Sequence, residues 1–96
     1  MTEPIKLINH ELLGAVLRIE RKRKGYTKAE ELSKAINACT GLKISQETIY
    51  KIEQGKQKAS LDQLAAICAA LYGEPFPESL FTALSKCIAN VHDVQD

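Results

Sequence analysis

The spacing of apolar residues along the chain predicts five helices. Apolar side chains recur at intervals of three or four positions, which places them on one face of a helix. The repeats predict helices over residues 10–24, 28–38, 46–54, 61–72 and 78–90. Residues 1–6 show no repeat and are expected to form a loose arm. With 96 residues, the sequence is predicted to fold as a single all-α domain spanning residues 1–96.

Residues suited to capping stand directly before four of these helices. Asn9, Thr27, Ser45 and Ser60 occupy these positions, where a side-chain oxygen accepts a hydrogen bond from an unpaired amide of the first turn. Gln63 follows Ser60 at the spacing of a capping box, in which the two residues bond each other's backbone amides. The caps therefore support the starts of the predicted helices.

The helix predicted over residues 46–54 separates an apolar face from a polar face. Ile49 and Ile52 lie on one side of it. The opposite side carries long polar groups, with Gln46 at its flank: Glu47, Tyr50, Lys51 and Gln54. Such groups can reach the base edges and phosphates of duplex DNA. Because Lys56 and Lys58 follow in the next loop, this segment has the composition of a DNA recognition helix.

The net charge of +1 conceals an asymmetry between the two parts of the chain. Residues 1–60 hold twelve of the thirteen basic and seven of the twelve acidic side chains, a net charge of +5. Residues 61–96 carry a net charge of −4. One part can therefore face a polyanion while the other turns away from it, although a solvated charge gradient is the alternative interpretation.

Several classes of protein are not indicated by the sequence. No apolar run approaches the roughly 18 residues of a membrane span, and no signal-peptide pattern is present, so a cytoplasmic protein is expected. The three cysteines, Cys39, Cys68 and Cys87, fit a reducing compartment, and Cys68 is expected in the core. Zinc-ligand spacings and glycine-rich phosphate loops are missing, so neither metal, cofactor nor enzymatic activity is expected.

Several stretches have the form of motifs from one known family: Leu13-Gly14 with Leu17-Arg18, Lys24–Thr27, Glu31-Leu32, Thr48–Lys56 and Ser60-Leu61. The fourth stretch is the most diagnostic of them, and the Glu-X-Gly-Lys sequence that ends it is a fairly specific signal in this setting. Through these motifs the chain resembles the Cro/C1-type, or XRE-like, helix-turn-helix family of phage repressors. The resemblance covers about residues 13–72 and implies a five-helix, lambda-repressor-like DNA-binding domain.

Three features depart from the pattern of that family. The connection between the second and third helices is longer than usual, which predicts an enlarged loop over residues 39–44 that tilts the third helix or adds a DNA contact. An extra residue after Thr27 leaves the register of the second helix open. Glu20 stands at a position that is usually apolar, so Ile19 is expected to replace it in the core.

The candidate base contacts lie on the third helix. Side chains at the N-terminal end of a recognition helix lie deepest in the major groove, and Gln46 and Glu47 occupy that end. Glutamine can bind adenine and glutamate can accept from the cytosine amino group, although Glu47 also suits the helix dipole. Tyr50 and Lys51, one turn further on, are expected to contact a base or a phosphate.

The resemblance also implies contacts with the DNA backbone and one structural ion pair. Backbone contacts are expected from four lysines, each of which has a solvated surface charge as its alternative interpretation: Lys28, Lys43, Lys56 and Lys58. Arg21 and Glu53 match family positions that pair between the first and third helices. That pair is expected to hold the recognition helix on the scaffold.

The function expected is sequence-specific binding of double-stranded DNA by a homodimeric transcriptional repressor on an inverted repeat. The fifth helix is the candidate dimer interface, or alternatively completes the core, because its apolar line exceeds what one small domain needs: Leu80, Phe81, Leu84, Ile88 and Val91. One alternative is an antitoxin or restriction-controller regulator, with a toxin as possible partner. Another is a protein-interaction module that has lost DNA binding.

Overall fold

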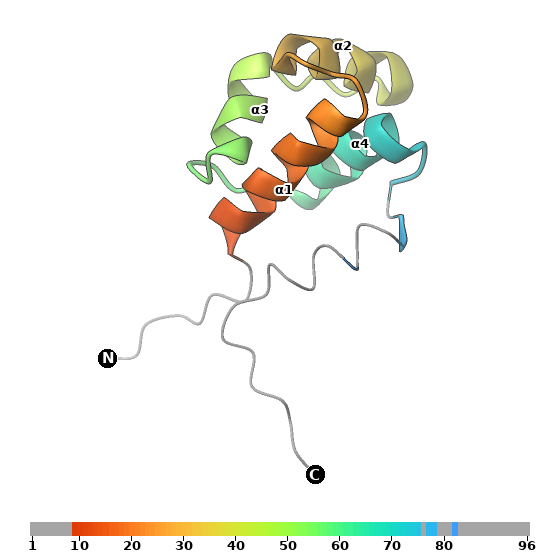
Figure 1. Cartoon of the computed structure of the whole chain (residues 1–96). Helices are drawn as coiled ribbons and strands as arrows, with labels where there is room; N and C mark the ends of the chain where they lie inside the picture. Colours follow the sequence, from red (N-terminus) through yellow and green to blue (C-terminus); the bar gives the residue numbers. More distant parts are fainter. Residues whose placement is uncertain (1–8, 76, 79–81, 83–96) are drawn as a thin grey trace, which may run out of the picture.

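Four helices make up the fold that the computed structural model describes, which covers residues 9–75, 77, 78 and 82 (Figure 1). They are α1 His10–Arg23, α2 Ala29–Thr40, α3 Gln46–Glu53 and α4 Leu61–Tyr72. Helix α2 packs against α3 and α4, and α1 packs against α3. The all-α fold and four of the expected helices are therefore present. The arm over residues 1–6 and nearly all of the helix expected over 78–90 lie outside the described residues.

Three N-caps lie at their predicted positions. The side chains of Asn9 and Ser45 each accept a hydrogen bond from a first-turn amide of the following helix, at 3.0 and 3.1 Å. Ser60 and Gln63 form the expected capping box, in which each side-chain oxygen accepts from the other residue's amide at 3.0 Å. Each cap pairs an amide that the helix itself leaves without a partner, so these three helix starts follow from local sequence.

The start of α2 differs from the prediction, because its N-cap is Lys28 and not Thr27. The Glu31 carboxylate accepts hydrogen bonds from the Lys28 amide at 2.9 Å and from the Thr27 hydroxyl at 2.8 Å. These two bonds lower the pKa of Glu31, because they favour its charged form. The extra residue after Thr27 therefore lies before the helix, and Leu32 and Ile36 face the core.

The end of α2 also differs from the prediction. The helix continues through Cys39 to Thr40, two residues that were expected in a loop. The Thr40 hydroxyl donates to the Ile36 carbonyl at 2.7 Å, and Gly41, at a φ of +78°, closes the helix in a left-handed conformation. The expected enlarged loop is thus partly an extension of α2, and the connection itself comprises residues 41–45.

The core lies where the four helices meet, and α1 to α4 each contribute buried apolar side chains. Its larger members are Leu13, Leu17, Leu32, Ile36, Ile44, Ile49, Ile52, Ile67 and Leu71. Two leucines that follow the helical spacing of the core residues are nevertheless exposed, Leu12 at 40% and Leu61 at 70%. Both lie in the first turn of their helices.

The expectation that Ile19 replaces Glu20 in the core is wrong, because Ile19 is 63% exposed. Glu20 keeps a half-buried position by accepting a hydrogen bond from the Tyr72 hydroxyl at the end of α4. Burial, followed by the bond to Glu20, raises the pKa of Tyr72. The Lys24 ammonium lies 5.2 Å from the centre of the Tyr72 ring. These contacts join the ends of α1 and α4 without an apolar residue at position 20.

The two described cysteines are expected to differ in reactivity. Cys68 is fully buried, and burial raises the pKa of its thiol to about 12, whereas Cys39 is exposed. Because the thiolate is the reactive form, iodoacetamide at about pH 8 should label Cys39 and leave Cys68 unmodified in the folded protein. Peptide mass spectrometry measures both sites, with labelling in denaturant as the control. Rapid labelling of native Cys68 would contradict its buried position.

Candidate nucleic-acid interface

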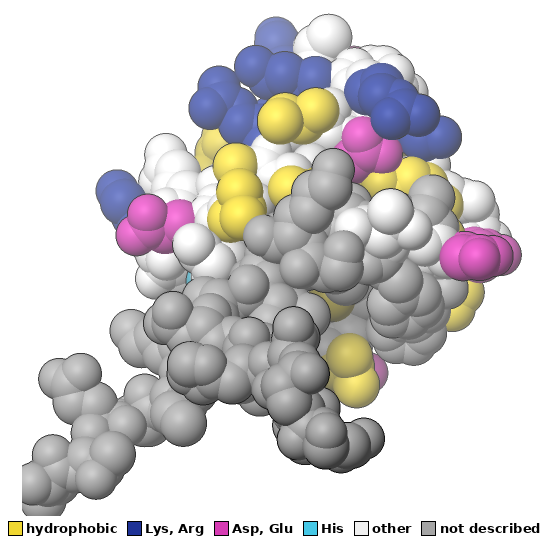
Figure 2. Space-filling model, turned by 60° about the horizontal axis from the view of Figure 1, so that its bottom comes forward, with side chains coloured by type: hydrophobic (Ala, Val, Ile, Leu, Met, Phe, Trp, Pro, Cys, Tyr) yellow, Lys and Arg dark blue, Asp and Glu magenta, His cyan; other side chains and the backbone are white. Residues whose placement is uncertain are grey.

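Positive charge is distributed over the surface of the described domain. Every Lys and Arg side chain within residues 9–75 is exposed except Arg21. Figure 2 shows one face of the molecule, on which most Lys and Arg side chains gather towards the upper edge, while acidic side chains lie at the sides and next to one of the basic clusters. Exposed cations of this kind attract a polyanion over long distances, because their fields add in solution.

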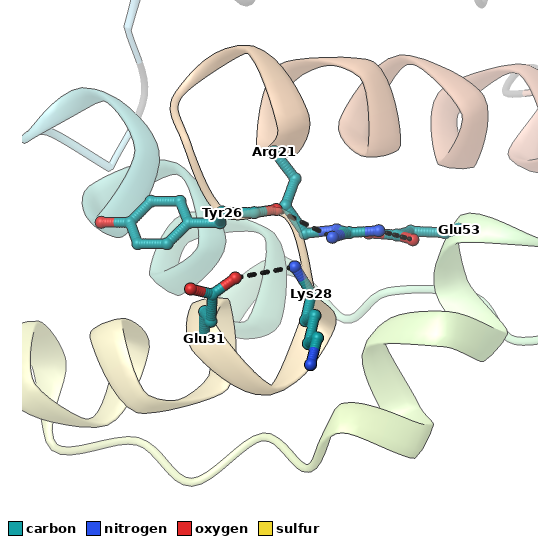
Figure 3. Close-up of polar contacts among 5 residues, drawn as sticks. All are labelled: Arg21, Tyr26, Lys28, Glu31 and Glu53. Carbon is teal, nitrogen blue, oxygen red and sulfur yellow. Dashed lines mark hydrogen bonds and ion pairs between the residues drawn. The ribbon is translucent and has the colours of Figure 1, made fainter.

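The buried Arg21 guanidinium forms the polar centre of the domain (Figure 3). Its Nε donates to Glu53 Oε2 at 2.7 Å and its Nη2 donates to Glu53 Oε1 at 3.1 Å. Its Nη1 donates to the carbonyl oxygen of Tyr26 at 2.8 Å. The guanidinium thus binds the Glu53 carboxylate on one side and the Tyr26 carbonyl on the other. It joins α1 and the turn after α1 to the last residue of α3. The orientation of α3 is therefore tied to that of α1.

A close backbone contact reinforces this attachment. A Cβ atom at Gly14 would lie 2.5 Å from the Glu53 carbonyl oxygen and nearer still to that of Ile52. On the other side of the contact, Gly55 has a φ of +74°, and a Cβ there would lie 2.8 Å from the Glu11 Cα. Only residues without a side chain allow α1 and the end of α3 to approach this closely.

The outer face of α3 carries the candidate base contacts. Ile49 and Ile52 are 1% and 3% exposed, so they direct the opposite side of the helix towards solvent. The structure brings four of the predicted site residues together on that exposed side: Gln46, Glu47, Tyr50 and Lys51. Their donors and acceptors suit the edges of bases in a major groove, which admits an α-helix.

The candidate backbone contacts at Lys28, Lys56 and Lys58 lie at the start of α2 and in the turn after α3. After the helix, the amides of Lys56 and Gln57 donate to the Lys51 carbonyl at 2.9 and 3.2 Å, which forms a tight turn. Lys56 and Lys58 are exposed on that turn. Lys28 is exposed at the start of α2, and in Figure 3 its ammonium points away from the Arg21 ion pair. These lysines therefore belong to two different segments, the start of α2 and the turn after α3.

Within the described part of the chain, no group of three His, Cys, Asp or Glu side chains could hold a metal ion. None of the helices described there has the length and apolar content needed to cross a bilayer. The candidate site thus consists of hydrogen-bonding and cationic groups on an exposed helix.

The sequence placed Gly14 and Tyr26 within family motifs but did not predict their roles in positioning α3. Glycine in the middle of a helix costs stability relative to alanine, so Gly14 was a detectable signal of a close helix contact. The contribution of Tyr26 comes from its backbone carbonyl, which every residue possesses. No side-chain pattern predicts such a contact.

Comparison with known proteins gives two similarities. A family model described as helix-turn-helix matches residues 17–71, from the middle of α1 to the end of α4. Among solved structures, the chain is similar to the clp gene regulator ClgR from C. glutamicum, with 28% identity and a TM-score of 0.64. That match covers 92% of this chain and 97% of the ClgR chain. No curated protein sequence matches.

Proposed function

Because this chain belongs to the Cro/C1-type helix-turn-helix family of DNA-binding transcription regulators, we propose that it represses transcription as a homodimer on an inverted repeat. The observation that carries the proposal is the exposed polar face of α3, which the buried Arg21–Glu53 pair holds in one orientation. A rigidly held face with several donors and acceptors can distinguish base sequences. The chain is accordingly a regulator and not an enzyme.

Base recognition is assigned to the first two turns of α3. Gln46 is assigned two hydrogen bonds with adenine, and Glu47 is assigned a hydrogen bond that it accepts from a cytosine amino group. Tyr50 and Lys51, one turn later, contact a base or a phosphate at the edge of the half-site. The support for this assignment is their common exposure on the side of α3 opposite Ile49.

Backbone binding is assigned to Lys28 at the start of α2 and to Lys56 and Lys58 in the turn after α3. Lysines on separate segments around a recognition helix can hold the two strands that border the major groove. These contacts release counterions, so affinity should fall steeply as salt rises. The exposure of all three ammonium-bearing side chains supports this role.

A dimer is proposed because one short recognition helix contacts only a few base pairs. Two copies related by a twofold axis would place their α3 helices about 34 Å apart, one turn of duplex DNA. The interface is assigned to four apolar residues, all of which lie outside the described residues: Phe81, Leu84, Ile88 and Val91. In a cell, such a dimer would act in the compartment that contains the DNA.

Selection of bound duplexes from a random DNA library tests the proposal, with a palindromic motif as the expected result. On the selected site, Gln46→Ala should cost about 1–3 kcal/mol at particular base positions and relax sequence preference there. Lys56→Ala should weaken binding to all sequences to a similar degree and reduce the salt slope by about 1. Competition binding with single-base variants of the site measures sequence preference and overall affinity. Binding titrations at several salt concentrations measure the salt slope.

Lys24→Ala provides a matched control, since Lys24 lies over the Tyr72 ring at the ends of α1 and α4. It should leave sequence preference unchanged. If the parent protein bound no duplex at low salt, DNA repression would be rejected in favour of a protein-interaction module. If the Gln46→Ala variant bound the palindrome with the same sequence preference as the parent protein, only the assignment of Gln46 would be rejected.

A further inference from the structure

The end of α3 that carries the candidate base contacts lies far from the ion pair that anchors the helix. Gln46 begins α3, and Glu53, the partner of Arg21, ends it. The helix rise places these two residues about 10 Å apart along the axis, so a tilt of roughly 6° about Glu53 would move Gln46 by about 1 Å. Hydrogen bonds to base edges need donor–acceptor distances of about 2.7–3.2 Å, and such a shift would break them. Base recognition thus requires a second point of attachment at the N-terminal end of α3.

The connection over residues 41–45 is attached to α2 next to that end. The Ile44 side chain is 4% exposed and belongs to the core. The Ser33 hydroxyl of α2 donates to the Ile44 carbonyl. Ser45 follows directly and caps α3 by accepting from the Thr48 amide at 3.1 Å. Ser33 is therefore linked to the first turn of α3 through two consecutive residues.

The beginning of the connection is bonded to the end of α2. The Thr40 hydroxyl donates to the Ile36 carbonyl and accepts from the Leu42 amide at 3.1 Å. Gly41 then turns the chain back along α2, as the connecting ribbon in Figure 3 shows. The exposed Lys43, an expected DNA backbone contact, lies on this returning segment. A shift of the connection would break side-chain hydrogen bonds at both of its ends.

The Ser33 bond differs from the Thr40 bonds in its range along the chain. Thr40 bonds residues four positions before it and two positions after it, contacts that a helix end can form by itself. Ser33 is half-buried and bonds a residue eleven positions away, so its bond forms only when the connection packs on α2. Because the acceptor is a backbone carbonyl, the bond determines the path of the chain into α3.

We propose that Ser33 is a positioning residue for base recognition, which sets the tilt of the N-terminal end of α3 through the Ile44 carbonyl. The inference rests on the proposed DNA-binding function and adds to it a residue of α2 that determines sequence preference by positioning α3. The Arg21–Glu53 pair holds one end of α3 and Ser33 holds the other.

Ser33→Ala in the full chain should reduce base preference at the base pairs that Gln46 contacts. A bidentate contact discriminates between bases by roughly 5- to 150-fold, and displacement of Gln46 should lower this discrimination by about three- to tenfold. Competition binding with single-base variants of the selected duplex measures the change. Ser33→Thr keeps the hydroxyl and should retain the preference of the parent protein.

Ser60→Ala is the matched control, because it also removes one serine hydroxyl that bonds the backbone. That hydroxyl accepts from the Gln63 amide within the first turn of α4. Loss of the cap should lower stability and leave base preference unchanged. If Ser33→Ala had the same base preference as Ser60→Ala, the positioning role would be overturned, whatever its effect on stability.

A double-variant cycle tests whether Ser33 acts through Gln46. In the Gln46→Ala background, Ser33→Ala should cause no further loss of preference at the same base pairs, because the contact is already absent. Fully additive losses would overturn the inference.

Amide hydrogen exchange, measured by NMR without DNA, tests the attachment itself. In Ser33→Ala, the Thr48 and Ile49 amides of the first turn of α3 should exchange faster than in the parent protein, whereas the Leu64 amide of α4 should not. Unchanged protection of Thr48 and Ile49 would overturn the inference alone. Absence of any duplex binding by the parent protein at low salt would overturn the proposed function and, with it, the role of Ser33 in base recognition.

Discussion

Glu53→Ala is expected to destabilise the domain by about 3–5 kcal/mol, because it leaves a buried guanidinium without its carboxylate. Arg21 is 2% exposed, and the Tyr26 carbonyl would remain its only hydrogen-bond partner among the residues that the structure describes. A domain of this size is stable by about 5–15 kcal/mol, so the loss is a large part of the total. DNA affinity should fall as well, since α3 would lose its attachment to α1.

Urea and thermal unfolding of the variant measure the stability change, and binding to the selected duplex measures the second effect. Glu30→Ala is a matched control, because it removes a carboxylate from the exposed pair with Lys34 and should change stability by at most about 0.5 kcal/mol. The double variant Arg21→Met with Glu53→Leu should be more stable than Glu53→Ala, because it leaves no buried charge. A Glu53→Ala protein as stable as its parent would reject the role of the pair as an anchor.

Gly14→Ala is expected to destabilise the domain by about 2–3 kcal/mol, the scale of overpacking in a rigid core. The new Cβ would meet the carbonyl groups of Ile52 and Glu53, which are backbone atoms and cannot rotate away. Helix α1 or the end of α3 must then shift. Because the same residues set the position of α3, DNA affinity should decrease together with the free energy of unfolding.

The sign of this effect distinguishes packing from helix propensity. Glycine-to-alanine changes inside helices ordinarily stabilise by roughly 0.5–1 kcal/mol. Ala15→Gly, at the neighbouring exposed position of α1, should destabilise through propensity alone. Chemical denaturation should therefore show a loss of stability for both variants, although they exchange alanine and glycine in opposite directions. If Gly14→Ala stabilised the protein, α1 and the end of α3 would have to lie further apart than the structure places them.

Local sequence was sufficient for features that depend on neighbouring residues. Asn9, Ser45 and Ser60 cap their helices because a cap needs only the amides of the next turn. The apolar spacing of Ile49 and Ile52 likewise determined which side of α3 faces the core. The predicted ends of α2 were wrong. At the start, Glu31 accepts from the Lys28 amide, so the N-cap is Lys28 and not Thr27. At the other end, the Thr40 hydroxyl donates to the Ile36 carbonyl, and the helix continues to Thr40.

The sequence by itself determined the four helices, the polar face of α3 and the motifs that indicate a DNA-binding family. Only the tertiary structure decided how Glu20 is accommodated, since its partner Tyr72 is 52 positions away along the chain. It also decided that α2 continues through Cys39 to Thr40, where a loop was expected. Contacts between distant residues depend on how helices pack, and apolar periodicity specifies the face of a helix without specifying its neighbour.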